Sequence, residues 1–340
     1  MTFCRMLDYN PPSVYLDGEK SIRSMGIGCG GRQMFKRRLL LLAVAAVILV
    51  FGVDSVLADP TTEAPAAKVP PKSPVAKKDK YPRHKNIRLK LTEGEKLTYA
   101  IKWGAVDAGI ATLSVKRKEE LGPNGPKVWN IQCKTRSNAF VSMFYEVRDD
   151  IKSLVDVKGG YTRLFDMEKN EGNYHATERI EFDYKAMEAK YVKVKKKLFS
   201  EKKRTKMIKL PGEARKVQDP LSCLYYARGL DLKVGSEHKI TVNTSKKNWV
   251  MTIKVLREEK QDIKGLGRVQ ALVVEPTAQF QGIFVRKGKM TVWLEKQTKI
   301  PLRMKVKIPI GSASAVLTKA ENSPLSSLAS SKDRSKSRKK

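Results

Sequence analysis

The chain has 340 residues and a formal net charge of +33, with 68 lysines and arginines against 35 aspartates and glutamates. Its three histidines and four cysteines do not occur at the C-x-x-C or H-E-x-x-H spacings of metal and redox sites, and the sequence contains no nucleophile-elbow motif or phosphate-binding loop. We therefore expect no metal, no cofactor and no familiar catalytic motif.

The first predicted element is an export signal at residues 34–58. Basic residues at 36–38 precede an apolar run from Leu39 to Val53, and small side chains follow up to Ala58. These are the parts of a secretory signal peptide, and the run is short for a permanent membrane span. We expect cleavage after Ala58 and export to the periplasm of a bacterial cell. An uncleaved inner-membrane anchor is the alternative.

Residues 1–33 precede this signal, although a signal peptide works at the N-terminus of its chain. We expect them to be a misannotated upstream extension, with translation beginning at Met34. They contain the sequence GIGCGG at 26–31. Neither a strand nor a βαβ unit frames these glycines, which argues against a dinucleotide site.

Two polar segments frame the predicted β domain at 91–318. Residues 59–90 are rich in Pro, Ala and Lys and are expected to be an extended linker, and the basic tail at 319–340 is expected to be disordered. The domain holds 45 basic and 26 acidic residues, a net charge of +19. In an exported protein this charge favours an anionic membrane or polysaccharide over nucleic acid as partner. A solvated basic surface is the alternative.

The domain alternates between apolar and polar residues with a period of two. In the first segment Leu97, Tyr99, Ile101 and Trp103 face one way and lysines and a threonine face the other, which is typical of a half-buried antiparallel strand. Strands are expected at 96–103, 110–116, 129–135, 147–157, 161–168, 177–184, 190–199, 205–210, 237–243, 248–255, 268–275, 289–295, 301–308 and 312–318. The predicted fold is mostly β, with one large, strongly curved antiparallel sheet that is an open barrel or sandwich-like.

One short helix is predicted to pack on this sheet. Asp219 is suited to cap it, Pro220 to its first turn and Gly229 to its end. After the predicted strand at 96–103, Gly104 and Gly109 bracket the sequence AVDA. This predicts a tight hairpin, in which glycine allows positive φ or a close backbone approach.

Asp149 is the most unusual residue of the strand pattern, because it shares a face with Val147 and Ile151. A buried carboxylate needs a partner, and Arg228 or Arg286 would supply one. Asp149 is then either a polar anchor inside a pocket or one half of a structural ion pair. A strand bulge that turns it outward is a further alternative.

Aromatic and polar residues on the predicted inner faces either line a ligand cavity or fill the core. The candidate ligand-binding residues are Trp103, Tyr145, Asp149, Tyr225, Arg228 and Trp293. Cys133 and Cys223 would either pair in an oxidising compartment or remain free.

The segment 191–209 contains nine basic residues and one acidic residue. As a hairpin it would present a positive ribbon to an anionic surface, or its lysines would protect a sheet edge from pairing. The candidate surface-binding residues are Lys193, Lys195, Lys197, Lys202, Lys203 and Arg204.

Four segments together resemble the exported bacterial family known as domain of unknown function 3108. They are GEKLTYAIKWGAVDAGIATLSV, FVSMFYEVRDDIKSLVD, DPLSCLYYARGL and RKGKMTVWLEKQTKIPLRMKVKIPIGSASAVL, and the resemblance spans 93–317. It implies an envelope protein with a mostly β domain and no established activity. The matching positions are Trp103, Gly104, Gly109, Phe144, Tyr145, Asp149, Asp219, Pro220, Tyr225, Arg228, Trp293, Pro301 and Gly311, and the resemblance gives none of them a catalytic role.

Three functions remain open from the sequence. The first is a non-catalytic, monomeric envelope protein that binds an apolar or amphipathic molecule in its curved sheet. The second is a scaffold that docks on an anionic polymer or membrane through the basic hairpin. The third, a hydrolase or polymer-modifying enzyme, would need polar groups that converge in one cleft, such as Asp149 beside a histidine.

Overall fold

A computed structural model describes residues 81–326, apart from 84, 86, 88, 198, 213–215, 245, 279–289 and 308–310. The predicted upstream extension, the signal peptide, the linker up to residue 80 and the tail from 327 lie outside the described residues. Within the described part of the chain, no helix is both long and apolar enough to cross a membrane.

The described residues form one large antiparallel sheet, which confirms the predicted fold class. The strands are β1 (Lys96–Trp103), β2 (Val106–Val115), β3 (Glu119–Glu120), β4 (Lys127–Ser137), β5 (Arg148–Asp156), β6 (Thr162–Glu171), β7 (Tyr174–Asp183), β8 (Glu188–Lys197), β9 (Ser200–Lys209), β10 (Glu237–Thr244), β11 (Lys247–Ile263), β12 (Gly267–Ala278), β13 (Met290–Glu295), β14 (Pro301–Lys307) and β15 (Ser312–Glu321). The short helices α2 (Ala139–Ser142) and α3 (Ser222–Ala227) accompany them, and residues 324–326 after β15 are also helical.

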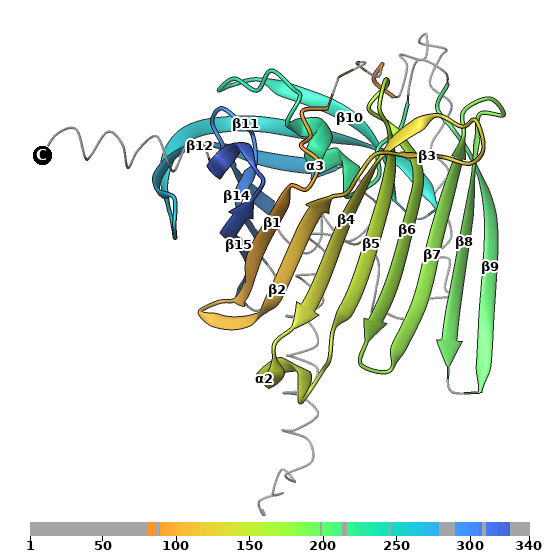
Figure 1. Cartoon of the computed structure of the whole chain (residues 1–340), viewed down its shortest axis with the longest axis horizontal. Helices are drawn as coiled ribbons and strands as arrows, with labels where there is room; N and C mark the ends of the chain where they lie inside the picture. The colour runs from red at the N-terminus through yellow and green to blue at the C-terminus, as the bar shows by residue number, and fades with distance from the viewer. Residues whose placement is uncertain are drawn as a thin grey trace, which may run out of the picture.

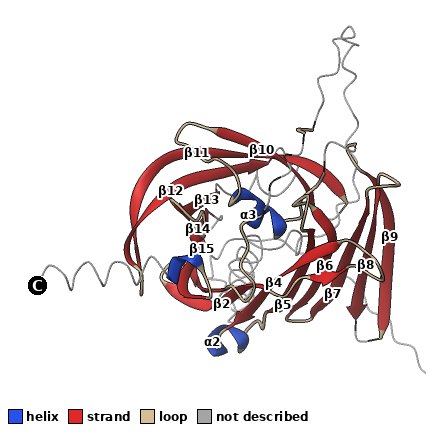
Figure 2. Cartoon of the chain, turned by 45° about the horizontal axis from the view of Figure 1, so that its top comes forward, coloured by secondary structure: helices blue, strands red, loops and turns tan. Residues whose placement is uncertain are grey.

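The sheet is a continuous meander whose two edge strands, β9 and β10, come from the middle of the sequence. Its order is β10-β11-β12-β13-β14-β15-β1-β2-β4-β5-β6-β7-β8-β9, with β3 paired to β4 outside this path. The first strand therefore pairs with the last one, and the two outermost strands, β9 and β10, are joined in sequence by the segment that carries α3. The curved sheet surrounds α3, while β7, β8 and β9 extend to one side (Figures 1 and 2).

Two residues bridge the sheet between β6 and β10. The amide of Thr162 in β6 donates to the Val217 carbonyl at 3.0 Å. On the other side, the Gln218 amide donates to the Thr241 carbonyl at 2.9 Å, and the Asn243 amide donates to the Gln218 carbonyl at 2.7 Å. Val217 and Gln218, here called the crossing segment, complete a ring from β10 through β15, β1 and β2 to β6. The strands β7–β9 lie outside this ring and are called the side panel.

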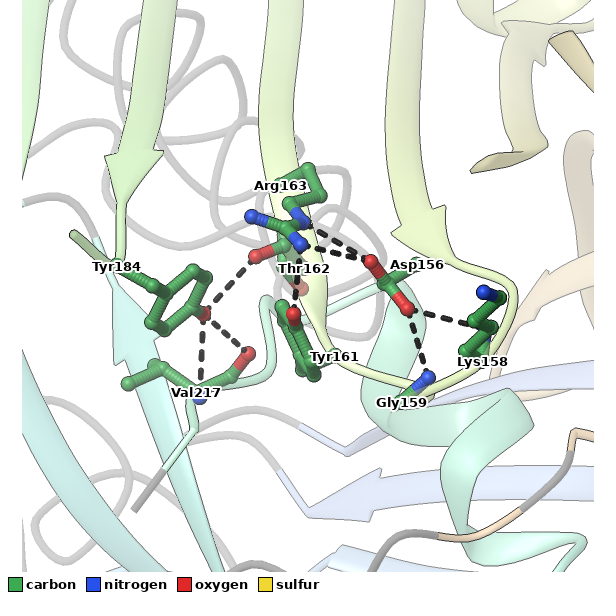
Figure 3. A network of polar contacts seen from close by, with 8 residues as sticks. All are labelled: Asp156, Lys158, Gly159, Tyr161, Thr162, Arg163, Tyr184 and Val217. Carbon is green, nitrogen blue, oxygen red and sulfur yellow. Dashed lines mark hydrogen bonds and ion pairs between the residues drawn. The ribbon is translucent and has the colours of Figure 1, made fainter. Parts of the chain in front are cut away.

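A polar network fixes the turn between β5 and β6 beside this crossing (Figure 3). One carboxylate oxygen of Asp156 accepts from the amides of Lys158 and Gly159, at 3.0 and 2.7 Å. The other accepts from the Arg163 guanidinium at 2.8 and 3.1 Å, which also donates to the Tyr161 hydroxyl at 2.7 Å. Because Asp156 is buried, these donors are needed to compensate the loss of water.

Tyr184 ties the side panel to the crossing segment (Figure 3). Its hydroxyl donates to the Thr162 carbonyl at 2.9 Å and accepts from the Val217 amide at 3.3 Å. The Tyr184 and Tyr161 rings meet edge to face, with centroids 4.7 Å apart. The start of β6, the end of β7 and the crossing segment are therefore held together at one point.

The predicted β1–β2 hairpin is present, and its two glycines act differently. Gly104 lies in the turn with φ of +57° and has open space around its Cα. Gly109 lies within β2, where an added Cβ would come 2.2 Å from the Arg136 carbonyl oxygen of β4. Positive φ explains the first glycine, and close backbone approach explains the second.

We expect Gly109→Ala to lower the free energy of unfolding by about 2–3 kcal/mol, because two paired backbones must separate to admit the methyl group. Gly104→Ala is the matched control and should cost only about 1 kcal/mol of left-handed backbone strain. Urea denaturation of both variants measures the difference. Equal losses would contradict the close approach.

Candidate functional site

Asp219 is a fully buried hub where the crossing segment turns into α3. One carboxylate oxygen accepts from the amides of Leu221 and Ser222, at 2.7 and 2.8 Å. The other accepts from the Thr162 hydroxyl at 2.8 Å and from the Ser153 hydroxyl. Burial raises the pKa of Asp219, and these donors oppose that shift. The N-cap residue of α3 is Leu221, and Asp219 lies two residues before it, where it binds the amides at the start of the helix and fixes the helix against β5 and β6.

The end of α3 is fixed by a second buried polar group. The Arg228 guanidinium donates to both carboxylate oxygens of Glu95, at 2.6 and 3.0 Å, and both side chains are buried. Arg228 also lies 5.4 Å from the centre of the Tyr225 ring. Nearby, the buried Tyr99 hydroxyl donates to the Pro301 carbonyl at 2.9 Å. Tyr225 and Arg228, two of the candidate ligand-binding residues, are therefore buried at the point where α3 meets the residue before β1.

Asp149 does not pair with Arg228, and this prediction is wrong because Glu95 occupies that guanidinium. The other suggested partner, Arg286, lies outside the described residues. Asp149 is buried on the inner face of β5, and its carboxylate accepts from the Asn170 amide at 3.0 Å. Burial and the nearby Glu171 carboxylate raise the pKa of Asp149 to about 7.

Asp149 belongs to a charged cluster on the inner face of β5, β6, β7 and β8. Its buried members include Lys169, Glu171 and Glu178, and Glu178 forms an ion pair with Lys193. Burial raises the pKa of Tyr145, and the negative charge of Glu171 raises it further. The Tyr145 ring packs against Gly172. The cluster joins buried carboxylates, lysines and a partly buried tyrosine, and burial of such groups shifts their pKa values.

The two described histidines do not complete a catalytic pair with Asp149. His175 is exposed on the outer face of β7 and contacts Asn170 at 2.8 Å, His238 lies near the start of β10, and His84 is outside the described residues. Within the described part of the chain, no three His, Cys, Asp or Glu side chains are grouped to hold a metal ion. The Asp149–histidine arrangement that the enzyme hypothesis invoked is therefore absent from the described residues.

A groove of about 450 Å³ lies at the seam between the two ends of the sheet. Tyr191 of β8 and Arg204, Thr205 and Lys206 of β9 line one side, and Lys246 of the β10–β11 turn lines the other. Tyr191 was not among the predicted site residues, nor were Thr205, Lys206 and Lys246. Their meeting depends on how the two sheet ends approach one another, which strand periodicity does not contain.

The inner face of the side panel changes character along its strands. At the crossing end it is apolar, where Ala189 of β8 lies between Phe182 and Ile208. One pair further along, Tyr191 lies opposite Lys206. Beyond it the paired residues are basic: Lys193 with Arg204, and Lys195 with Lys202. Because cross-strand partners share a face, buried apolar side chains at the crossing end give way to a row of cations toward the β8–β9 turn.

The predicted surface-binding lysines therefore fall into three groups. Lys195, Lys202 and Arg204 are exposed on the inner face, and Lys203 is exposed on the outer face. Lys193 is partly buried against Glu178, so it is an internal ion-pair partner and the prediction of a surface contact is wrong. The side chain of Lys197 lies outside the described residues.

Two predicted tryptophans lie apart from one another. Trp103 ends β1 on the same face as Tyr99, near Gly311. Trp293 faces the outside of the sheet, since its neighbours Val292 and Leu294 are buried, and its indole donates to Glu259. The prediction that Trp293 faces inward is wrong.

The two cysteines of the domain are free and buried, so the alternative of a disulfide is not realised. Burial raises the pKa of the Cys133 thiol to about 12, and burial also raises that of Cys223. Neither thiol has the low pKa that a reactive cysteine needs.

Residues 98–318 match the model of a protein family of unknown function, DUF3108. The chain belongs to the DUF3108 family. This confirms the resemblance found in the sequence. No curated protein sequence matches the chain.

The solved structures that resemble this DUF3108 protein include the following three. A β-barrel-like protein of the family DUF1849 from Brucella abortus is 10% identical with a TM-score of 0.44, over 68% of this chain and 98% of that one. An exported protein with a YmcC-like fold from Bacteroides fragilis is 8% identical with a TM-score of 0.30, over 69% and 99%. A structure described as a lipoprotein, from Parabacteroides distasonis, is 10% identical with a TM-score of 0.30, over 69% and 99%. At these identities and scores none of them implies a function for this chain.

We expect Arg228→Met to destabilise this DUF3108 domain by about 3–5 kcal/mol, because it leaves the Glu95 carboxylate buried and unpaired. Adding Glu95→Gln should recover part of the loss, since a neutral amide is easier to bury than a charge. Urea denaturation of the single and double variants tests this. If the second substitution deepens the loss, the buried ion pair is not the cause.

Asp149 should make the domain less stable as pH rises from about 4 to about 7. Its pKa of about 7 in the folded state exceeds that of an unfolded aspartate, so the folded state binds the extra proton in this range and loses it as pH rises. Asp149→Asn keeps the acceptor for Asn170 but cannot ionise. We expect the free energy of unfolding of the variant, relative to that of wild type, to be about 2–4 kcal/mol higher at pH 8 than at pH 4.

Chemical denaturation at a series of pH values measures this difference. Asp150→Asn is the matched control, because Asp150 is the next residue of β5 and its side chain is 43% exposed beside Arg136. The control should retain the pH dependence of wild type. A pH dependence that Asp149→Asn leaves unchanged would show that another group of the cluster is responsible.

Proposed function

We propose that the protein is an exported, non-catalytic cell-envelope protein that binds an anionic amphiphile in the seam groove. The observation that carries this proposal is the passage from apolar to basic residues along the inner face of the side panel. An amphiphile joins an apolar body to a charged head, and this groove combines the Tyr191 ring with three cations, Arg204, Lys206 and Lys246.

The charged head would lie against Arg204, Lys206 and Lys246. Three cations around a groove of about 450 Å³ suit a phosphate or carboxylate group, and the volume falls within the usual range of small-molecule sites. The apolar body would lie against Tyr191 at the edge of the buried apolar residues of β8 and β9. The Tyr191 ring marks the boundary, since an aromatic ring with a hydroxyl tolerates both environments.

Export supports the choice of an envelope molecule. The signal pattern at residues 34–58 directs the chain to a compartment bounded by membranes, where anionic phospholipids and glycolipids are the abundant amphiphiles. Charge supports the choice of an anion, because the domain between 91 and 318 carries a net charge of +19.

The direct test is native mass spectrometry of the exported protein, followed by solvent extraction and analysis of any bound lipid. A stoichiometric anionic amphiphile would support the proposal. For a defined probe, dihexanoyl phosphatidylglycerol below its micelle concentration is compared with dihexanoyl phosphatidylcholine by calorimetry. The anionic lipid should bind more tightly, and the difference should shrink at high salt, where surface charges are screened.

We expect Arg204→Glu with Lys206→Glu to weaken binding of dihexanoyl phosphatidylglycerol by about 30-fold or more. Each well-placed cation contributes on the order of 1 kcal/mol, and 1.4 kcal/mol corresponds to a factor of ten. The matched control is Lys190→Glu with Lys203→Glu, which makes the same charge change on the outer face of the same hairpin. Equal weakening by both pairs would show attraction to net charge alone and would contradict a groove site.

A further inference from the structure

Large apolar side chains are exposed at the end of the sheet that carries α2. Phe140, Met143 and Phe144 are 57%, 73% and 54% exposed. The two phenylalanine rings contact each other edge to face, with centroids 5.6 Å apart. In the turn between β8 and β9, Phe199 is 94% exposed. Exposed aromatic groups of this size indicate a contact with an apolar phase or partner.

These two apolar turns lie at the same end of the molecule. β4 runs into α2 at Ser137, and β5 leaves it at Arg148, whereas β8 enters its turn at Lys197 and β9 leaves at Ser200. Since β4 to β9 are consecutive antiparallel neighbours, the β4–β5, β6–β7 and β8–β9 connections share one end of the sheet. Both cartoon views place α2 and the β8–β9 turn on that side (Figures 1 and 2).

The exposure of the α2 turn is built into the fold. The Asn138 side chain accepts from the Val141 backbone amide at 2.9 Å and donates to the Asp107 carbonyl at 2.7 Å. The backbone amide of Asn138 donates to the Ala108 carbonyl at 3.0 Å. Val141 is buried against Ala108 and Val147. With one side chain inward and Asn138 capping the turn, Phe140 and its exposed neighbours are held outward.

Cations surround the second apolar turn. Between residues 195 and 204 the sequence has six basic residues and one acidic residue, and Lys196, Lys202 and Lys203 are exposed beside Phe199. Exposed aromatic groups next to clustered lysines match the two layers of a membrane surface, where rings enter the interface and ammonium groups meet anionic headgroups.

We propose that this end of the molecule, formed by α2 and the β8–β9 turn, docks on an anionic lipid bilayer. Phe140, Met143, Phe144 and Phe199 enter the interfacial region, and the hairpin lysines contact the headgroups. An acidic polysaccharide would neutralise the same lysines but would leave the apolar side chains in water, so the aromatic groups favour the bilayer. This surface is separate from the seam groove and does not depend on a ligand there.

The test is flotation of the exported protein, in the form that the cell produces, with vesicles of phosphatidylglycerol and phosphatidylcholine in equal parts. Wild type should float with these vesicles and not with phosphatidylcholine alone. Phe140→Ser with Met143→Ser and Phe144→Ser should lower the partition coefficient at least about tenfold, because the apolar area is lost. Adding Phe199→Ser should lower it further.

The matched control replaces three exposed apolar residues elsewhere, Met207, Val234 and Leu256, with serine. It should change partitioning less than about twofold, within the scatter expected of exposed substitutions. Unchanged flotation of the Phe140, Met143 and Phe144 variant would overturn the proposal. So would retention of wild type on an acidic polysaccharide without flotation.

A second readout tests insertion of the α2 end into the bilayer, and it also works if the apolar segment before residue 58 is retained and anchors every variant. Phe144→Trp in vesicles with brominated chains should lose more fluorescence than wild type, because the new indole meets the bromine atoms. No additional quenching would contradict insertion. The serine variants should still bind soluble dihexanoyl phosphatidylglycerol like wild type, so failure of the groove proposal and failure of this one are distinguishable.

Discussion

The ring of this protein depends on one buried carboxylate. Asp219 is removed from water where the crossing segment meets α3, and a charge in that position is tolerated only when donors surround it. Two of its donors are the first amides of α3, and two are hydroxyls of β5 and β6. The same carboxylate therefore positions the helix inside the ring and the crossing segment against the sheet. Because Val217 and Gln218 immediately precede it, the bridge between β6 and β10 is fixed by the same contacts.

This closure separates the ring around α3 from the side panel. The ring from β10 to β6 encloses α3, with Arg228 and Glu95 as a buried polar pair near the helix end. The strands β7 to β9 lie outside the closure, and their inner face is buried at the crossing end and exposed toward the β8–β9 turn. The groove lies between these two regions, at the seam with the β10–β11 turn.

Strand periodicity predicted most elements because each strand of a half-buried sheet records its own two faces. It could not predict that β1 pairs with β15 or that β6 is bridged to β10, since these contacts join residues far apart in sequence. The errors have the same origin. Arg228, one of two partners suggested for Asp149, is held by Glu95, because the choice of ion-pair partner depends on the three-dimensional arrangement. Trp293, expected to line a cavity or fill the core, faces outward, because Val292 and Leu294 define the inner face.

Some of the groove could have been found from the sequence. Once the turn of the 191–209 hairpin is placed at 198–199, cross-strand pairing puts Lys193 opposite Arg204 and Lys195 opposite Lys202, all on the face of Tyr191. The row of cations follows from that register. Lys246 does not, because it arrives from the other end of the sheet.

The two proposed surfaces have a common orientation along the strands. The row Lys195, Lys202 and Arg204 begins near the β8–β9 turn and continues toward Tyr191 and the apolar inner face. With the α2 end on a bilayer, an anionic headgroup that left the membrane would meet this row first and the groove at Tyr191 beyond it. A cation row that faced the opposite end would have no such path. The direction in which the inner face changes from basic to apolar residues therefore relates membrane docking to ligand binding. The two proposals rest on separate residues and are tested by separate measurements.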